Sequence, residues 1–460
     1  MNWKQVFIDV KFNKKKKEKH MFFRNFLFTF LSTLLAICFG GAQSFHFDRA
    51  YNYSKNLAGH AMLVMLHGRI VYEKYASGWS STNLHPLASG TKSFSGVLCM
   101  MAVQDGLLKL DEKLADTITE WKNDPRKSKI TYRQLLTLTS GIKGGRIGVP
   151  VSYSQAIKAP TFADPGKAFS YGPVPFQIFG EALKRKLRPK NMSVADYIKK
   201  KILNPLGITR FYWRNFNTGE PYLNAGAYLT ARDWAKYGEL LRGKGSYGGK
   251  NLLSPNLLKE CFKGTKVNPQ YGLTFWLPQR DSIASPGSAF ARGAGKQRLY
   301  FLPVQDMVVI RYGNTPQSSQ YNDDTFLRLL FSFYSNKWAV SINPISTATF
   351  NMDAGNSFGG KPYIIFGSFS GTVPGFDYDN IHVALNIDPL FWITFTYPNT
   401  PPFQAFQGVL DSNGKAKAYF KNTFTLPSAV TSIKMFYTYV IMESNKLVFS
   451  SNPILLGFKL

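Results

Sequence analysis

The spacing of apolar residues divides the chain into regions with different periodicities. Between residues 92 and 106, apolar side chains recur at three- and four-residue intervals and Gly106 closes the run, which predicts a helix with a buried face. Strand-like runs enclose such helical segments, so we expect an antiparallel sheet covered by helices. The other elements expected in this region are a helix over 175–187 and strands over 62–66, 70–75, 299–302 and 307–311.

The pattern changes after residue 335. Residues 336–360 are rich in turn-forming residues and short of apolar periodicity, which is typical of a linker. Residues 361–460 contain short runs of strand type separated by turns, without helical stretches, so we predict an accessory β-sandwich there. The expected strands are 363–366, 382–387, 391–397, 415–420, 433–442 and 447–449.

The first 42 residues have the pattern of a secretory signal peptide. A mostly apolar run over 26–39 follows a lysine-rich stretch and precedes the small residues 40–42. The run is short for a membrane span, so we expect an exported protein, periplasmic or extracellular, with cleavage near Gln43 and no transmembrane helix in the mature chain. Met21 is an alternative start, and the bulky Ile37 before Cys38 argues against a lipid anchor.

Candidate chemistry begins with Ser89 and Lys92, at the start of the predicted helix 92–106. Residues i and i+3 share one helix face, so the lysine amine would lie beside the serine hydroxyl. Ser89 would open the helix, where free N–H groups and the helix dipole favour developing negative charge. A serine with an adjacent amine base is a complete nucleophile pair. A plain helix N-cap is the alternative interpretation.

Two further serine–lysine pairs have the same spacing in other contexts. The pair Ser140 and Lys143 follows an apolar run and encloses Gly141, which is typical of a helix end. The pair Ser412 and Lys415 has the composition of a hairpin turn. The pair at Ser89 alone begins a predicted helix.

The positions of the histidines argue against a serine–histidine–aspartate hydrolase. They are His20, His46, His60, His67, His85 and His382. No histidine lies between Pro86 and Ile381, so a histidine base for Ser89 would have to be His85, an earlier histidine or the distant His382. The chain also lacks an H-E-x-x-H motif and a paired Cys/His cluster of zinc spacing. We therefore expect a lysine or tyrosine base, no metal and no cofactor.

Six segments follow one another in an order typical of one enzyme family. They are LASGTKSFSG at 87–96, LLTLTSG at 135–141, FSYGP at 169–173, LTARDWAKYG at 229–238, YGLTFWLP at 271–278 and GAGKQRLY at 293–300. In this order they resemble landmarks of the serine β-lactamase-related family, which includes class C β-lactamases, D-alanyl-D-alanine peptidases and related esterases. The likeness extends over residues 46–335. It implies an α/β (α+β) β-lactamase/transpeptidase-like fold.

The resemblance also implies roles for individual residues. Ser89 matches the acylated serine, Lys92 the lysine that assists its deprotonation, and Tyr171 the tyrosine that shares the acid/base work. A phenol ionises near pH 10 in water, so we expect the Lys92 ammonium to favour a Tyr171 phenolate. The third motif falls on Gly293, Ala294 and Gly295, where the N–H of Ala294 would join that of Ser89 in an oxyanion hole.

Two departures from the family pattern bear on the substrate. The second motif usually ends in Asn or Ser, whereas Pro173 here offers neither a side-chain amide nor a backbone N–H. The third motif of penicillin-recognising members is Lys-Thr-Gly or His-x-Gly, whereas this chain has Arg292 before Gly293. Arg292 either replaces the missing cation in substrate binding or is a surface arginine. Both departures favour simple ester or amide cleavage over β-lactams or D-Ala-D-Ala.

Net charge and cysteine content limit the partners and the disulfides that we expect. The formal net charge is +29, which favours anionic envelope polymers as partners. No nucleic-acid motif accompanies the charge, so we do not expect nucleic-acid binding. Cys99 and Cys261 remain after signal cleavage, and the helix position of Cys99 indicates a buried thiol rather than a disulfide framework.

Together these features predict an exported serine hydrolase that cleaves an ester or amide of a small molecule or envelope component through an acyl-enzyme. The expected regions are a signal peptide at 1–42, a hydrolase domain at 43–335, a linker at 336–360 and a β-sandwich at 361–460. A D-alanyl-D-alanine peptidase or β-lactamase is the alternative enzyme. A catalytically silent envelope-binding protein with the same fold is the alternative from another class.

Overall fold

The computed structural model describes residues 47–459, except residues 150, 280–281, 342–345, 423–427 and 445. The predicted signal peptide lies outside these residues, so export and cleavage near Gln43 stay predictions. Among the helices that are described, none combines the length and the apolar character needed to cross a bilayer.

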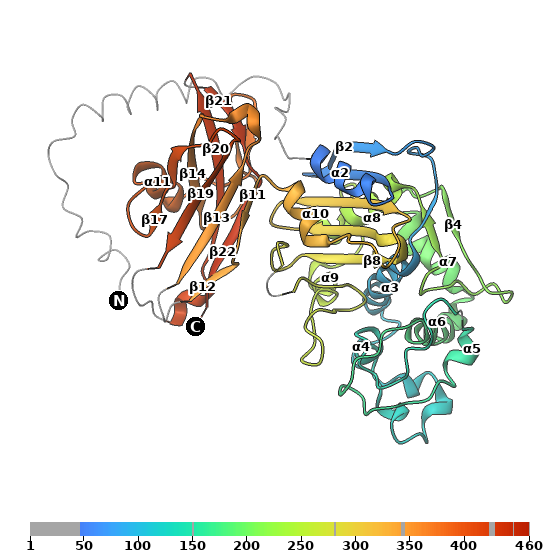
Figure 1. The fold of residues 1–460 in the computed structure, drawn as a ribbon. Coiled ribbons are helices and arrows are strands. Elements are labelled where there is room, and N and C mark those ends of the chain that lie inside the picture. Colours follow the sequence, from blue (N-terminus) through green and yellow to red (C-terminus); the bar gives the residue numbers. More distant parts are fainter. Residues whose placement is uncertain are drawn as a thin grey trace. The chain divides into compact units, whose positions relative to one another are not determined.

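A five-stranded antiparallel sheet organises the first folded region, in the order β2-β1-β10-β9-β8 (Figure 1). Its strands are β1 (Gly59–Leu66), β2 (Arg69–Tyr75), β8 (Ala289–Gly293), β9 (Gln297–Leu302) and β10 (Met307–Gly313). Strand β1 pairs with β10, so the two ends of the region meet in the middle of the sheet. The four strands predicted from sequence are confirmed, and β8 completes the sheet.

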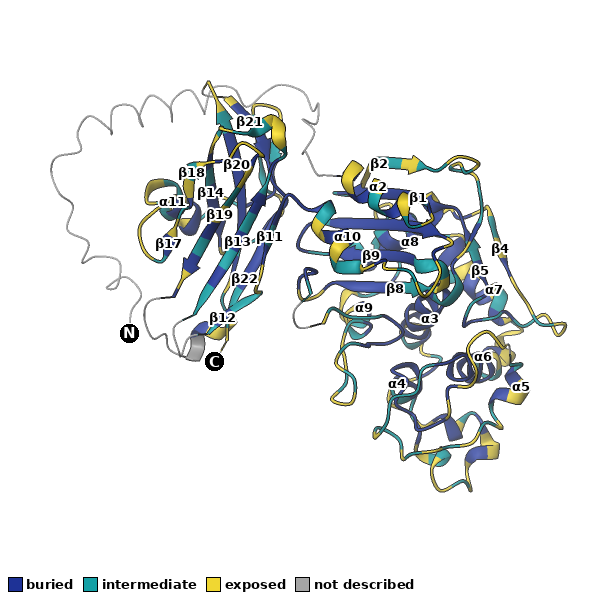
Figure 2. Cartoon of the chain, viewed as in Figure 1, coloured by how far each residue is buried: buried dark blue, intermediate teal, exposed yellow. Residues whose placement is uncertain are grey.

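Alternating side chains along the strands pack against helices on both faces of this sheet. On β1, Leu63 joins a core with Leu98 of α3 (Lys92–Gln104) and Trp234 of α8 (Ala231–Arg242). The next residue, Val64, joins a separate core with α2 (Phe47–Asn56) and α10 (Asp323–Leu330). Figure 2 shows the strands of this sheet as mostly buried, apart from the edge strand β2. The expected sheet covered by helices is therefore present.

The helix predicted over 92–106 is α3, and its end follows from local chemistry. Gly106 adopts a left-handed φ of 69°, and the N–H groups of Gly106 and Leu107 donate back to Val103 O and Ala102 O. Cys99 on this helix and Cys261 are both free and buried. The remaining helices are α4 (Tyr132–Leu136), α5 (Tyr153–Ala156), α6 (Val174–Leu187), α7 (Val194–Ile198) and α9 (Pro255–Glu260). Short strands complete this region: β3 (His85–Pro86), β4 (Phe211–Trp213), β5 (Ala227–Leu229), β6 (Ser246–Tyr247) and β7 (Lys250–Asn251).

The C-terminal region is rich in strands that form two main sheets around a common core. One sheet has the order β11-β13-β19-β17, and the other runs β12-β22-β20-β14-β18 with β21 paired to β20. Phe350 and Ala418 of the first sheet share a core with Ile365 and Tyr437 of the second. The strands are β11 (Phe333–Ser335), β12 (Ala339–Ser341), β13 (Thr347–Asp353), β14 (Pro362–Ser368), β15 (Phe376–Tyr378), β16 (Ile381–Val383), β17 (Phe403–Gln404), β18 (Gln407–Val409), β19 (Lys415–Lys421), β20 (Lys434–Glu443), β21 (Lys446–Ser450) and β22 (Ile454–Lys459).

Two expectations for this region differ from the structure. Residues 336–360 contain β12 and β13 rather than only a linker, because polar and apolar residues alternate along β13 and place Phe350 and Met352 in the core. The run 391–397 is helical rather than extended, as part of α11 (Pro389–Thr396). Asp388 caps that helix by accepting from the N–H groups of Leu390 and Phe391 at 2.9 and 3.3 Å.

Candidate active site

Ser89 lies on a 3₁₀ turn, η1 (Ala88–Thr91), that continues directly into α3. We expected it at the helix N-cap, but Lys92 is the first α-helical residue. Residues i and i+3 also face each other in a 3₁₀ turn, so the predicted pairing survives the shift. Ala88 adopts a left-handed φ of 46°, a strained value for a residue with a side chain.

Lys92 is buried next to the serine. Its Nζ lies 2.9 Å from Ser89 Oγ and donates to the carbonyl of Asn224 at 2.9 Å. The Tyr171 ring centroid is 5.0 Å from Nζ. Burial disfavours the charged amine and lowers the pKa of Lys92 to about 7. A neutral amine beside a hydroxyl is able to accept its proton.

Tyr171 is the third member of the cluster. Its ring lies beside Trp276, with ring centroids 5.4 Å apart. Burial raises the pKa of Tyr171, and hydrogen bonds to Ser89 and Trp276 offset part of that rise. Burial therefore works against the expected phenolate, because it disfavours the charged forms of both Lys92 and Tyr171. The side chain is better suited to give a proton than to take one.

The backbone around Tyr171 is fixed by a close crossing of two glycines. A Cβ on Gly172 would lie 2.0 Å from Gly144 O, and one on Gly144 would lie 2.5 Å from Tyr171 O. Pro173 follows in helical conformation and starts α6. It leaves the second motif without a side-chain amide, as the sequence indicates.

Two buried amides near Lys92 were missed from the sequence. Gln177 on α6 donates from Nε2 to Asn224 Oδ1 at 3.1 Å and accepts from the N–H of Leu223 at 3.3 Å. The Asn224 carbonyl then binds Lys92. No spacing in the sequence relates residues 177 and 224 to 92, so only the fold brings them together. Trp276 was quoted within a family segment, but its contact with Tyr171 was not anticipated.

The third-motif segment lies against the serine turn. A Cβ on Gly293 would sit 2.1 Å from Leu87 O and 3.2 Å from the backbone nitrogen of Gly90. The end of β8 therefore packs directly on the turn that carries Ser89. Ala294 follows at once, in a short turn that leads to Gln297 of β9. The backbone N–H of Ala294 is thus close to the serine in the folded chain, although the two are far apart in sequence.

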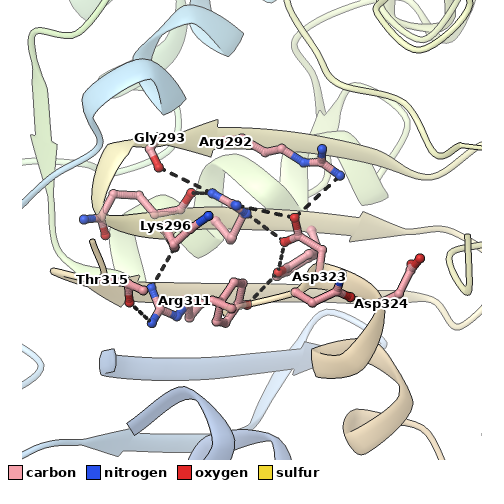
Figure 3. Close-up of polar contacts among 12 residues, drawn as sticks. Arg292, Gly293, Lys296, Arg311, Thr315, Asp323 and Asp324 are labelled. Atoms are coloured by element: carbon pink, nitrogen blue, oxygen red, sulfur yellow. Dashed lines mark hydrogen bonds and ion pairs between the residues drawn. The ribbon is translucent and has the colours of Figure 1, made fainter. Parts of the chain in front are cut away.

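Arg292 has other partners within the protein. Its guanidinium lies 3.7 Å from Asp323 Oδ2 and 4.9 Å from the ring centroid of Phe290 (Figure 3). Phe290 belongs to the core under α2 and α10, whereas the intervening Ala291 belongs to the core that contains Leu87. Alternation along β8 therefore puts Arg292 on the α10 side of the sheet.

Other serine motifs lack the features of this site. Ser412 lies in a turn where Asp411 Oδ1 accepts from the N–H groups of Asn413 and Lys415, each at 2.9 Å. Ser140 is buried, while Lys143 is exposed.

One G-x-S-x-G string, at 355–359, occurs in the chain. Its Ser357 is exposed on a 3₁₀ turn between β13 and β14 rather than on a strand-to-helix elbow.

Comparison with known proteins gives a consistent family and fold. The sequence model of the family Beta-lactamase matches residues 46–331. No curated protein matches the chain. A candidate β-lactamase from Bacteroides dorei DSM 17855 has a similar structure, with 17% identity, a TM-score of 0.54, and coverage of 62% of this chain and 98% of that one.

Two further solved structures show the same fold. A family VIII carboxylesterase has 17% identity and a TM-score of 0.52, covering 64% of this chain and 98% of that one. A penicillin-binding protein homologue from Caulobacter crescentus has 16% identity and a TM-score of 0.51, with coverage of 63% and 97%. At such identities the likeness establishes the fold alone.

Proposed function

We infer that this chain, which belongs to the β-lactamase family of serine hydrolases, cleaves ester or amide bonds through an acyl-enzyme on Ser89. The observation that carries the proposal is the 2.9 Å contact between Ser89 Oγ and the buried Lys92 Nζ. A silent binding protein would have no need to bury an amine beside a hydroxyl, because that burial costs desolvation energy. We place the enzyme outside the cytoplasm, in keeping with the predicted signal.

The first half of the reaction forms the acyl-enzyme. Neutral Lys92 takes the Oγ proton as Ser89 attacks the substrate carbonyl, and the carbonyl π electrons move onto its oxygen. The resulting oxyanion accepts from the N–H groups of Ser89 and Ala294. When the tetrahedral intermediate collapses, the bond to the leaving group breaks, and this group takes its proton from Tyr171, which is reprotonated by Lys92, or directly from Lys92; in both cases Lys92 is neutral again.

The second half returns the enzyme to its starting state. A water molecule gives a proton to the same base and attacks the acyl carbonyl. Collapse of this second intermediate releases the carboxylic acid and returns the proton to Ser89 Oγ. Burial lowers the pKa of Lys92 and raises that of Tyr171, which suits the amine to act as the base and the phenol to act as the acid.

The activity should rise with pH through neutrality. Lys92 must be neutral to accept the serine proton, and its pKa is about 7, so the competent fraction grows as pH increases through that value. We expect kcat/KM for p-nitrophenyl butyrate to climb along a single ascending limb with its midpoint near 7 and to level off above it. A stopped-time assay from about pH 5 to about pH 9 checks this. A profile without an inflection near neutrality would contradict the role of Lys92 as base.

The substrate class follows from the missing contacts. Pro173 supplies no amide for a substrate carbonyl, and Arg292 is turned to Asp323 rather than to a substrate carboxylate, so a carboxylated β-lactam lacks two contacts; a hydrogen bond to a charged group is worth about 1.5–3 kcal/mol. Short acyl esters need only the serine, its base and the oxyanion donors. We expect p-nitrophenyl acetate and butyrate to turn over through Ser89 while nitrocefin does not.

Both substrates should be measured on one preparation, with Ser89→Ala as the blank. Efficient nitrocefin hydrolysis with negligible esterase activity would favour the β-lactamase or D-alanyl-D-alanine peptidase alternative. Absence of any turnover, together with no covalent labelling by a fluorophosphonate, would favour the silent binding protein instead. The two results separate the three classes.

A further inference from the structure

The turn between β8 and β9 is held by an arginine that follows it in sequence. Arg298 is buried, with 6% of its surface exposed. Its Nη1 donates to Gln297 O at 3.0 Å and, with a longer contact, to Gly293 O at 3.4 Å. On its other side the guanidinium binds Asp323 of α10 at 2.7 and 3.3 Å. Asp323 therefore fixes the arginine, and the arginine fixes two carbonyls of the turn.

A second buried arginine, Arg311 on β10, holds two other carbonyls of the same turn. Its Nη1 donates to Gly295 O at 3.0 Å and to Lys296 O at 2.8 Å. Thr315 and Ser54 accept from its remaining nitrogens at 2.6 and 3.0 Å. Figure 3 shows this guanidinium between Thr315 and the turn at Lys296. Like Arg298, Arg311 binds residues outside the turn with some of its nitrogens and carbonyls of the turn with another.

The turn needs such support because its backbone is strained. Gly295 has a φ of 73° and the next residue, Lys296, a φ of 57°. Glycine adopts a left-handed backbone without strain, whereas a residue with a side chain does not, so the strain lies at Lys296. The same two residues present their carbonyls to Arg311, which is how the conformation is maintained. Backbone strain that the surroundings enforce is often found at functional sites.

The planarity of the peptide group connects these hydrogen bonds of the turn carbonyls to the candidate oxyanion hole. The carbonyl of Gly293 and the N–H of Ala294 belong to one planar, trans peptide group, so they point in opposite directions. Holding Gly293 O toward Arg298 therefore aims the Ala294 N–H to the opposite side, and the adjacent Gly293 α-carbon lies against the serine turn. Arg298 thus sets the direction of the Ala294 N–H through the carbonyl at the other end of the same peptide group.

We propose that Arg298 and Arg311 are positioning residues that orient the Ala294 N–H for the oxyanion by fixing the carbonyls of the β8–β9 turn. The inference rests on the proposed acyl-enzyme function and assigns it two residues outside the reacting cluster. A purely structural role explains the observations less well. Apolar side chains would fill a sheet face at lower desolvation cost than two buried guanidinium groups.

The test compares the variants Arg298→Lys and Arg311→Lys with wild type. Each variant keeps the positive charge but loses the guanidinium, whose several N–H donors bind several oxygens at once. We expect kcat for p-nitrophenyl butyrate to fall about 10- to 100-fold in each, because a misaimed donor loses part of the 10²- to 10³-fold effect of removing it. KM should stay within about twofold, since the donor acts on the transition state. Inhibition by phenylboronic acid, whose serine adduct places an oxygen in the same hole, should weaken in parallel with kcat.

Arg242→Lys is the matched control. Arg242 is another partly buried arginine of this region, paired with Glu239 and Asp306, and none of its hydrogen bonds within the described chain reaches the turn. It should lower the melting temperature to a similar extent while leaving kcat and boronate affinity near wild type. This control separates positioning from general stabilisation.

Several outcomes would overturn the proposal. Wild-type kcat in folded Arg298→Lys and Arg311→Lys would refute it, as would a loss of activity that tracks melting temperature in all three variants. Should either arginine variant fail to fold, Thr315→Val removes one anchor of Arg311 and keeps both arginines, and an unchanged kcat there counts against the proposal. If wild type itself is neither active nor labelled at Ser89, the proposed function fails first, and the fluorophosphonate experiment identifies that case.

Discussion

Ser89→Ala and Lys92→Ala are each expected to lower kcat for p-nitrophenyl butyrate by about 10⁴-fold or more, because nucleophile and base act as one unit. The contact of 2.9 Å between Oγ and Nζ is the reason for expecting such a loss from either residue. The double variant should be little worse than either single one. Steady-state kinetics and mass spectrometry of the fluorophosphonate adduct measure the effect.

A matched control for this prediction lies elsewhere in the chain. Ser412 and Lys415 have the same spacing, but Ser412 lies in a turn, and Lys415 begins β19 with its N–H donated to Asp411. Ser412→Ala should leave both kcat and labelling at the wild-type level. Full labelling of Ser89→Ala, or equal losses in Ser412→Ala, would mean that the nucleophile has been assigned to the wrong residue.

Gly293→Ala should nearly abolish activity through a steric effect alone. Gly293 has an extended φ of −127°, which alanine adopts freely, so backbone strain is not the cause. The added Cβ would meet Leu87 O at 2.1 Å and force β8 away from the serine turn. We expect kcat to fall by about 10²-fold or more as the Ala294 N–H moves. Overpacking should also lower the free energy of unfolding by about 1–3 kcal/mol.

Kinetics and thermal unfolding of the same sample distinguish these two effects. Gly457→Ala on β22 is the control, because the nearest atoms to its added Cβ are 3.6 and 3.7 Å away, an ordinary contact. It should change neither kcat nor stability appreciably. A Gly293→Ala protein with wild-type kcat would show that the end of β8 takes no part in the reaction.

Sequence patterns gave reliable predictions for several elements of the first folded region. Helix α3 and the strands β1, β2, β9 and β10 follow the predicted ranges closely, and all of them except the exposed edge strand β2 are buried over most of their length. The pairing of Ser89 with Lys92 was also predictable, since it depends only on local spacing. The run that became α11 was misread because its apolar residues fit either period, and the capping by Asp388 was not considered.

The parts of the site that depend on tertiary structure were not predictable from spacing. Gln177 and Asn224 meet near Lys92 through the packing of α6, and nothing local marks them. The raised pKa of Tyr171 follows from burial, which the sequence does not reveal. Arg292 alternates with Ala291 along β8, but which of the two faces α10 is settled only by the register of the sheet.

The order of strands in the sheet has a consequence for when this enzyme becomes active. The chain supplies Ser89 and Lys92 early, whereas Ala294 and the strands β9 and β10 come some two hundred residues later, and β1 finds its central partner only in β10. A chain that emerges from its amino end therefore has the serine, the lysine and the Ser89 N–H, but it lacks the Ala294 N–H, and the edge of β1 that pairs with β10 is open. Under the proposed acyl-enzyme function, hydrolysis waits for the long-range closure of the sheet, so we expect a partly synthesised chain to be inert toward esters.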